Sequence, residues 1–317
     1  MNDREEQLWA MIEARDTTIR VLRQEPDKLV DELQAKEDVI QQQNLALIEL
    51  REVCALCFAL SGVLRPVTRR IKPLYQALRP RLGRLKQYPP RPLWVPPNYR
   101  ESLVPRDDWP RISLVTPSYN QADFIERTMQ SVLSQSYPDL EYFVQDGASD
   151  DDTPDIIARH ANRLNGWASE QDGGQADAIN RGFARTNGEV MAWLNSDDLL
   201  LPGALQYVGD YFARHSEVDV VYGHRVMIDE EDREIGRWVM PSHDNDVLSW
   251  ADFIPQETLF WRRGIWEKAG GGLDVEHQFA LDWDLLLRFR DAGARFVRLP
   301  RLLGAFRVHE AQKTSAV

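Results

Sequence analysis

Apolar positions recur at the spacing of a heptad repeat over the first 64 residues, and charged or amide side chains fill most of the rest. The two core positions of the repeat are Ile12, Ile19, Pro26, Leu33, Ile40, Leu47 and Cys54, and Leu8, Arg15, Leu22, Leu29, Lys36, Gln43, Leu50 and Cys57. This pattern predicts a helical coiled coil over residues 1–64, interrupted at Pro26 because proline breaks a helix. The helices would pair with a second copy of the chain, or pack on the body of their own chain.

Basic and apolar residues alternate at roughly helical spacing over residues 65–86, and residues 65–100 contain no acidic side chain. Such a segment is suited to an anionic membrane surface, and a solvated basic linker helix is the alternative interpretation. The prolines from Pro89 to Pro97 predict a stiff, extended linker. We therefore expect residues 65–110 to connect the helical region to a separate domain.

From residue 111 onward, short apolar runs alternate with helical patterns. The runs at 112–116, 140–145 and 190–194 predict buried strands, and the stretches at 124–133, 153–157 and 177–185 predict helices. Strands that alternate with helices are typical of an α/β fold with a doubly wound parallel sheet. The sequence thus predicts one α/β domain over residues 111–317.

Composition limits what the chain binds and where it works. The formal net charge of −12 argues against nucleic acid as a partner, because proteins that bind it neutralise phosphates with Lys and Arg. Cys54 and Cys57 fall on heptad core positions, which favours a structural role over a redox or zinc pair. The chain begins with an acidic helical pattern rather than a signal peptide, and no apolar run approaches the roughly 20 residues that span a bilayer. We expect a cytoplasmic protein, with peripheral contact to the inner face of the cell membrane as a further option.

Polar side chains follow each of the three predicted strands. The strand-end residues are Thr116, Pro117, Ser118 and Asn120 after the first, Asp146, Gly147, Ser149, Asp150 and Asp151 after the second, and Asn195, Asp197 and Asp198 after the third. The carboxyl ends of parallel strands meet at one edge of a sheet, so we expect these residues to converge, although turn chemistry alone explains any single one. The sequence lacks the glycine-rich phosphate loops of dinucleotide enzymes and of P-loop ATPases. A bound diphosphate would therefore depend on a divalent cation held by these carboxylates.

Four motifs, in this order, resemble those of the family 2 glycosyltransferases. They lie at residues 115–120 (VTPSYN), 145–153 (QDGASDDDT), 169–182 (SEQDGGQADAINRG) and 195–198 (NSDD). The resemblance extends from about residue 111 to the C-terminus. It implies the GT-A fold, which is a Rossmann-like, mixed and mainly parallel sheet flanked by helices. It also implies transfer of a sugar from a nucleotide-sugar donor with inversion of configuration.

The resemblance assigns roles to the residues of the donor side. The residues that match the family's nucleotide contacts are Thr116, Pro117, Tyr119, Asp146 and Asp172. The family's Asp-x-Asp metal motif falls on residues 195–197, with Asn195 in place of its first aspartate. This leaves Asp197 as the main ligand of a Mg²⁺ or Mn²⁺ ion, with Asn195 and Asp198 beside it on the nucleotide sugar.

The second half of the domain supplies the remaining roles. Residues 280–288 (ALDWDLLLR) resemble the family's Glu-Asp-x-Asp motif, with Leu281 in place of the glutamate. Asp282 is the expected general base for the acceptor hydroxyl, and Asp284 is the alternative. His309 is a candidate metal ligand, and Arg307 or Lys313 is the candidate diphosphate contact. The residues expected on the acceptor side are Gln256, Glu257 and Trp283.

These features predict an inverting glycosyltransferase that acts on a glycan or lipid-linked acceptor in cell-surface polysaccharide biosynthesis. Two alternatives remain open. A coiled-coil scaffold with a degenerate transferase domain is one, although the presence of Asp146, Asp197 and Asp282 argues against it. A sugar nucleotidyltransferase is the other, but it would require a glycine-rich turn near the first strand, and this sequence lacks one.

Overall fold

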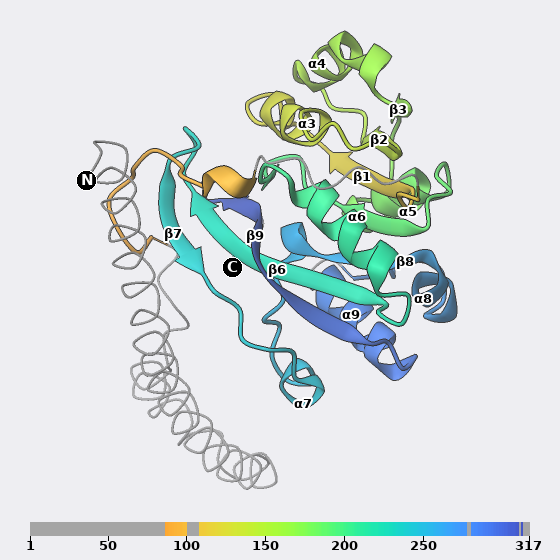
Figure 1. Cartoon of the computed structure of the whole chain (residues 1–317). Coiled ribbons are helices and arrows are strands. Elements are labelled where there is room, and N and C mark those ends of the chain that lie inside the picture. The colour runs from red at the N-terminus through yellow and green to blue at the C-terminus, as the bar shows by residue number, and fades with distance from the viewer. Residues whose placement is uncertain (1–85, 100–107, 278–279, 311, 313–317) are drawn as a thin grey trace, which may run out of the picture. The chain divides into compact units, whose positions relative to one another are not determined.

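The computed structural model describes residues 86–99, 108–277, 280–310 and 312. The predicted coiled coil at 1–64 and nearly all of the basic segment at 65–86 lie outside these residues, so both stay predictions. The described residues belong to one compact unit, Leu82–Val317 (Figure 1). Within them, no helix is both long enough and apolar enough to cross a membrane.

The core of this unit is one mixed sheet in the order β3-β2-β1-β4-β8-β6-β9-β5. Strand β7 pairs with the C-terminal half of β6. Its strands are β1 Ile112–Ser118, β2 Leu140–Asp146, β3 Gly166–Ser169, β4 Val190–Trp193, β5 Leu199–Leu200, β6 Val220–Ile228, β7 Glu234–Trp238, β8 Phe260–Arg262 and β9 Phe296–Arg307. The first four strands of this order are all parallel, and β6 and β9 are parallel to each other. Antiparallel β8 joins these two halves. The predicted α/β fold with a mixed sheet flanked by helices is confirmed.

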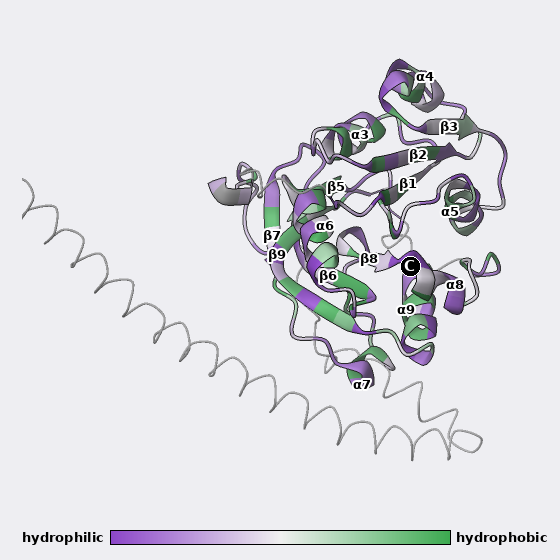
Figure 2. Ribbon diagram, turned by 45° about the vertical axis from the view of Figure 1, so that its right-hand side comes forward, coloured by the Kyte–Doolittle hydropathy of each residue, from purple (hydrophilic) through white to green (hydrophobic). Residues whose placement is uncertain are grey.

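Helices cover both faces of the sheet because its strands are apolar on both sides. The helices are α3 Ile125–Leu133, α4 Thr153–Arg159, α5 Gln175–Phe183, α6 Ala204–Arg214, α7 Asn245–Leu248, α8 Arg263–Lys268 and α9 Leu281–Asp291, with short 3₁₀ turns η1 Pro97–Tyr99, η2 Ala161–Arg163 and η3 Gln256–Thr258. Leu114, Val144 and Ala192 pack with α3, α4 and α6 on one face. Val115 and Trp193 pack with α5, α8 and α9 on the other. Figure 2 shows hydrophobic residues at the two ends of β6 and hydrophilic ones in its middle.

The strands predicted at 112–116, 140–145 and 190–194 correspond to β1, β2 and β4, and the helical patterns between them correspond to α3, α4 and α5. The short strand β3 was not predicted. Its residues Gly166–Ser169 are only half-buried, and Gly166 has no side chain because the ring of Phe143 occupies that space. A glycine and a four-residue length give little periodicity from which to predict a strand.

The proline-rich residues 86–99 contain bends and the short turn η1, and they pack on the domain. Their backbone pairs with β7, where the amide of Glu234 donates to the carbonyl of Arg91 at 2.7 Å and that of Arg91 donates back at 3.1 Å. Leu93, Val95 and Tyr99 pack on a small apolar cluster formed by β5, β6 and β9. The described part of the predicted linker therefore forms an additional edge of this unit.

Candidate active site

A cavity of about 1070 Å³ opens at the carboxyl ends of β1, β2 and β4. Pro117, Gly147 and Asn195 lie in its wall on that side, while the residues before η3 and the start of α9 form the opposite wall. Ligands bind at this edge in open α/β sheets. The charged side chains of its lining are Arg225 and the carboxylates Asp172, Asp197, Asp198, Asp252, Glu257 and Asp282.

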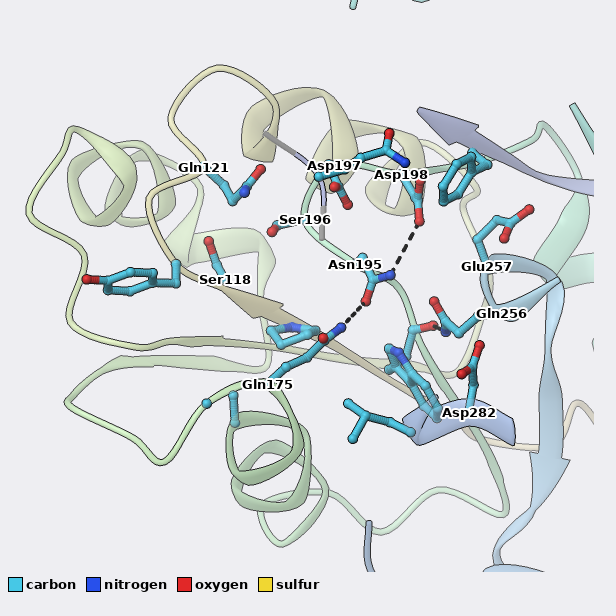
Figure 3. A pocket seen from close by; sticks show the side chains of 18 of the residues that line it. Ser118, Gln121, Gln175, Asn195, Ser196, Asp197, Asp198, Gln256, Glu257 and Asp282 are labelled. Atoms are coloured by element: carbon cyan, nitrogen blue, oxygen red, sulfur yellow. Dashed lines mark hydrogen bonds between the residues drawn. The ribbon is translucent and has the colours of Figure 1, made fainter. Parts of the chain in front are cut away.

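The segment Asn195–Asp198 lies at the centre of this wall, directly after β4 (Figure 3). Asn195 accepts a hydrogen bond from Gln175 Nε2 at 2.8 Å and donates to Asp198 Oδ2 at 3.5 Å. Asp198 Oδ1 accepts the backbone amide of Arg307 at 3.0 Å. Burial, together with the charges of Asp197 and Glu257, raises the pKa of Asp198 well above its usual range. Asp198 therefore joins this segment to the end of β9.

Asp197 faces the cavity beside His309, and its Oδ2 lies 3.0 Å from His309 Nε2. Carboxylate oxygen is a ligand that Mg²⁺ and Mn²⁺ both prefer, whereas imidazole nitrogen suits a transition-metal ion such as Mn²⁺ better than the harder Mg²⁺. In the part of the chain that the structure describes, no three His, Cys, Asp or Glu side chains are placed to hold an ion by themselves. Mg²⁺ is commonly held by one or two carboxylates plus substrate phosphates. The two residues thus fit a cation that binds together with a diphosphate.

Arg307, the candidate diphosphate contact, does not face the cavity. Its side chain is fully buried, and its guanidinium donates to the carbonyls of Asp197 at 2.7 Å and of Asp229 at 3.0 Å, beside an ion pair with Asp232. The sequence interpretation of Arg307 was therefore wrong: its side chain supports the segment Asn195–Asp198 from behind. Lys313, the alternative contact, lies outside the described residues.

The residues expected at the nucleotide separate into two groups. Pro117, Tyr119 and Asp172 line the cavity, and Tyr119 is 62% exposed at its rim. Burial raises the pKa of Asp172, although the amide of Gly174 donates to its carboxylate. A methyl group on Gly147 would lie 2.9 Å from Asp172 Oδ2, so the Asp172 carboxylate would have to shift if residue 147 carried a side chain.

Thr116 and Asp146 lie behind this wall. Thr116 is fully buried and shares a hydrogen bond with the hydroxyl of Tyr142 at 3.0 Å. Asp146 is also fully buried, and its carboxylate accepts hydrogen bonds from Ser149 at 2.5 Å and Ser169 at 2.6 Å. These contacts tie the ends of β2 and β3 together, so Asp146 supports the wall rather than lining it.

On the opposite wall, Asp282 lies in the first turn of α9 and lines the cavity, whereas Asp284 does not. Asp284 instead bonds Arg288 Nε at 2.9 Å. Burial raises the pKa of Asp282. Trp283 points away from the cavity, since its indole nitrogen donates to the carbonyl of Leu248 at 2.8 Å and its ring packs in the apolar core. Asp252, from the segment before η3, lines the cavity near Asp282.

Gln256 and Glu257 of η3 both lie in this wall, as expected (Figure 3). The amide of Gln256 donates to the carbonyl of Trp193 at 2.8 Å, and its buried carbonyl oxygen has no hydrogen-bond partner among the residues that the structure describes. Glu257 pairs with Arg225, which comes from β6. Sequence reasoning missed Arg225 and Asp252, because neither belongs to a motif or to a predicted strand end.

Sequence comparisons find glycosyltransferases among the proteins that this chain resembles. Residues 113–268 match the family model described as Glycosyl transferase family 2. A putative teichuronic acid biosynthesis glycosyltransferase of Bacillus subtilis is 40% identical over 92 residues, which are 28% of this chain and 36% of that protein. The chain spans 52% and 68% of the length of two other curated glycosyltransferases that it matches.

Two solved structures share the fold. Staphylococcus aureus TarS in complex with UDP-GlcNAc superposes with a TM-score of 0.55 at 19% identity, covering 65% of this chain and 61% of that one. The mannosyltransferase PcManGT of Pyrobaculum calidifontis, in complex with GDP-Man and Mn²⁺, gives 0.51 at 22% identity, covering 81% and 68%. At these identities the likeness establishes the fold alone.

Proposed function

We propose, from the family 2 glycosyl transferase domain at residues 113–268, that this protein transfers a sugar from a nucleoside-diphosphate sugar to an acceptor hydroxyl. The observation that supports this most is one cavity with Asp197 on one wall and Asp282 on the other. Structural relatives bind UDP-GlcNAc and GDP-Man, so a nucleotide sugar is the ligand class this fold is known to accept.

The donor would occupy the wall formed by the ends of β1, β2 and β4. Tyr119 and Pro117 would contact the base or ribose, with Asp172 bordering the nucleotide and Thr116 and Asp146 supporting them from behind. The hydrogen bonds of Asn195 and Asp198 would hold the segment 195–198 in place where it faces the diphosphate. Because carboxylates dominate the described cavity lining, a bare diphosphate would be repelled there.

Asp197 and His309 would hold the Mg²⁺ or Mn²⁺ ion that overcomes this repulsion. When bound, such an ion neutralises the charge that develops on the departing diphosphate. Mn²⁺ is present in one structural relative together with its donor.

Asp282 would act as the general base. As the acceptor oxygen bonds to the anomeric carbon, its proton passes to the Asp282 carboxylate, and the bond from that carbon to the diphosphate oxygen breaks. Attack from the face opposite the leaving group inverts the anomeric configuration. Gln256 and Glu257, which line the same wall, would border the acceptor. Trp283 would act on the acceptor only indirectly, through the packing of α9.

The acceptor would be a glycan or lipid-linked sugar of a cell-surface polysaccharide. A relative assigned to teichuronic acid biosynthesis supports this class.

We also propose that the basic segment at 65–86 binds anionic membrane at the cytoplasmic face and that residues 1–64 self-associate. Flotation with anionic liposomes at low salt tests the first idea, and light scattering of the full chain tests the second; no binding, or a monomer, would refute them respectively.

Transfer assays with a panel of nucleoside-diphosphate sugars, with and without Mn²⁺, test the proposed function. We expect one donor to release its nucleoside diphosphate only with metal present, and NMR to show an inverted anomeric centre in the product.

Asp282→Asn should reduce transfer by roughly 100-fold or more, since general-base catalysis contributes about that much. Asp284→Asn is the matched control and should keep most activity. Donor turnover with Asp282→Asn as fast as in the wild type would refute the base assignment.

A further inference from the structure

A hydrogen bond joins the two walls of the cavity at Gln256. This residue belongs to η3 on the acceptor side, and its amide nitrogen donates at 2.8 Å to the carbonyl of Trp193, the last residue of β4 on the donor side. Both residues line the cavity. Figure 3 shows Gln256 between Asn195 and Asp282. The transferred sugar has to lie between the diphosphate held near Asp197 and the base, so Gln256 stands where that sugar would be bound.

The Trp193 carbonyl fixes which way the Gln256 amide faces. A carbonyl oxygen only accepts hydrogen bonds, so the amide nitrogen has to point toward it and the amide oxygen away from it. Gln256 is 8% exposed, and its oxygen Oε1 has no hydrogen-bond partner among the described residues. The indole Nε1 of Trp193 is likewise buried and without such a partner. The lining thus offers an unused acceptor and an unused donor, and a ligand that pairs them recovers the cost of their burial.

The turn η3 that carries Gln256 is fixed from behind. Thr258 Oγ1 accepts the amide of Gly223 of β6 at 3.2 Å, and Glu257 pairs with Arg225 of the same strand. All three residues of η3 are buried. Because these contacts and the bond to Trp193 already order the Gln256 side chain, little conformational entropy is lost when a ligand binds to it.

Position in the cavity distinguishes Gln256 from a second buried glutamine, Gln135. The amide nitrogen of Gln135 donates to the carbonyl of Leu201 at 3.0 Å, and its carbonyl oxygen also has no partner among the described residues. Gln135 is 5% exposed, but it does not line the cavity. A ligand in the cavity can therefore contact the amide of Gln256 and not that of Gln135, which makes Gln135 a matched control.

We propose that Gln256 is a specificity-determining residue whose carbonyl oxygen accepts a hydrogen bond from a hydroxyl or acetamido N–H group of the transferred sugar. This inference rests on the proposed function. An ionised diphosphate offers only acceptors, so Gln256 selects among sugars and not among nucleotides. A sugar with a donor at the matching position satisfies the buried oxygen. A sugar without one leaves that oxygen unpaired, and its transfer is disfavoured.

Analogues of the active donor test this contact in the wild-type protein. In each analogue, one hydroxyl or acetamido group of the sugar is replaced by hydrogen. We expect one analogue to react with a kcat/KM about 10- to 100-fold below that of the intact donor, and the group it lacks identifies the partner of Gln256. A wild-type protein for which no analogue loses more than about threefold would overturn the inference without any variant.

Gln256→Met keeps about the same side-chain length and removes the amide. It should lower kcat/KM for the intact donor by a similar factor and show little further loss with the affected analogue, because the contact is already absent. Such non-additivity indicates a direct interaction. Gln135→Met also removes a buried amide, but it should retain the full penalty of the analogue. Calorimetry should show unchanged binding of the nucleoside diphosphate with Mn²⁺ to both variants, which establishes that they are folded.

Hydrolysis of the donor in the absence of acceptor distinguishes the two sugars. If Gln256 contacts the transferred sugar, Gln256→Met should slow the release of nucleoside diphosphate to water as much as it slows transfer. Unchanged hydrolysis with a raised KM for the acceptor would assign the contact to the acceptor and overturn the inference.

The outcomes also separate this inference from the function it rests on. If the wild-type protein turns over no nucleoside-diphosphate sugar, the proposed function fails and the inference fails with it. If the wild-type protein transfers a sugar but the penalty of the analogue persists in Gln256→Met, the inference alone is overturned. Loss of the penalty in Gln256→Met and its retention in Gln135→Met would support Gln256 as the residue that selects the sugar.

Discussion

His309 Nε2 lies 3.0 Å from Asp197 Oδ2, although 112 residues separate them in the chain. The contact forms because β9 ends beside the segment that follows β4, where Asp198 accepts the amide of Arg307. The His309 side chain is 3% exposed and that of Asp197 is 22% exposed, so the carboxylate alone has appreciable access to the cavity.

Asp197→Asn is expected to lower metal-dependent transfer by at least about 100-fold, because the ion contributes several kcal/mol to charge neutralisation. His309→Ala should weaken metal binding less, since the carboxylate remains. Calorimetry with Mn²⁺ should show tight binding only when a nucleoside diphosphate is present. Tight Mn²⁺ binding by the protein alone would contradict the two-residue site.

Gly147→Ala is expected to weaken nucleoside diphosphate binding without unfolding the protein. The added methyl group would lie 2.9 Å from Asp172 Oδ2, so Asp172 has to shift at the donor wall. Gly264→Ala is the matched control, because nothing lies within 4 Å of its added methyl group and alanine favours the helix α8. Calorimetric affinity measurements that showed equal weakening in both variants would argue against a donor site at this wall.

Tyr119→Ala is expected to reduce nucleotide affinity by roughly tenfold. The ring is 62% exposed at the cavity rim, and stacking of an aromatic ring on a base is worth about 1–3 kcal/mol. Tyr119→Phe keeps the ring and should bind nearly as well as the wild type. Titration of nucleoside diphosphate followed by tryptophan fluorescence measures both. Equal loss in the two variants would point to the hydroxyl instead of the ring.

Glu234→Gln is expected to destabilise the domain by about 2 kcal/mol at neutral pH, because the fully buried carboxylate accepts charge-assisted hydrogen bonds from Arg91 and Arg237. Burial opposes ionisation, but the bonds from Arg237, Tyr88 and Arg91 lower the pKa of Glu234 to about 2. A lowered folded-state pKa gives stability that is present above the ordinary value near 4.5 and is lost as pH falls toward 2.

Urea unfolding of wild type and Glu234→Gln at several pH values measures this effect. The difference in unfolding free energy should shrink between pH 4.5 and pH 2. Glu231→Gln is the control, since that carboxylate is 63% exposed in its ion pair with Arg233 and should contribute little. A difference for Glu234→Gln that stays constant over this range would contradict the assigned role.

Much of the first half of the domain follows from local sequence. Strands buried on both faces appear in the sequence as short apolar runs. The strands β1, β2 and β4 could therefore be located from residues 112–116, 140–145 and 190–194. Residues at the ends of parallel strands must share one edge of the sheet, which predicted a common site for Pro117, Ser118 and Asp197. Both predictions rest on periodicity and chain direction, which are local properties.

Successive side chains of a strand point to opposite faces of the sheet, and this explains why the sequence interpretation of Thr116 as a nucleotide contact was wrong. Val115 packs toward α5, so Thr116 points to the other face, where it meets Tyr142 instead of the cavity. Asp146 continues β2 into a turn whose serines occupy its carboxylate. Position at a strand end does not fix the direction of a side chain, and the packing of each turn decides it.

The sequence by itself determined the α/β domain, the edge of the sheet that bears its site, and Asp197 and Asp282 as candidates. Only the tertiary structure decided that His309 meets Asp197, that residues 86–99 extend the sheet edge, and that Arg225 pairs with Glu257 in the cavity wall. The physical reason is the distance along the chain over which each interaction acts. Strand periodicity and turns are set by neighbours along the chain, whereas burial and charge pairing depend on segments brought together by the whole sheet.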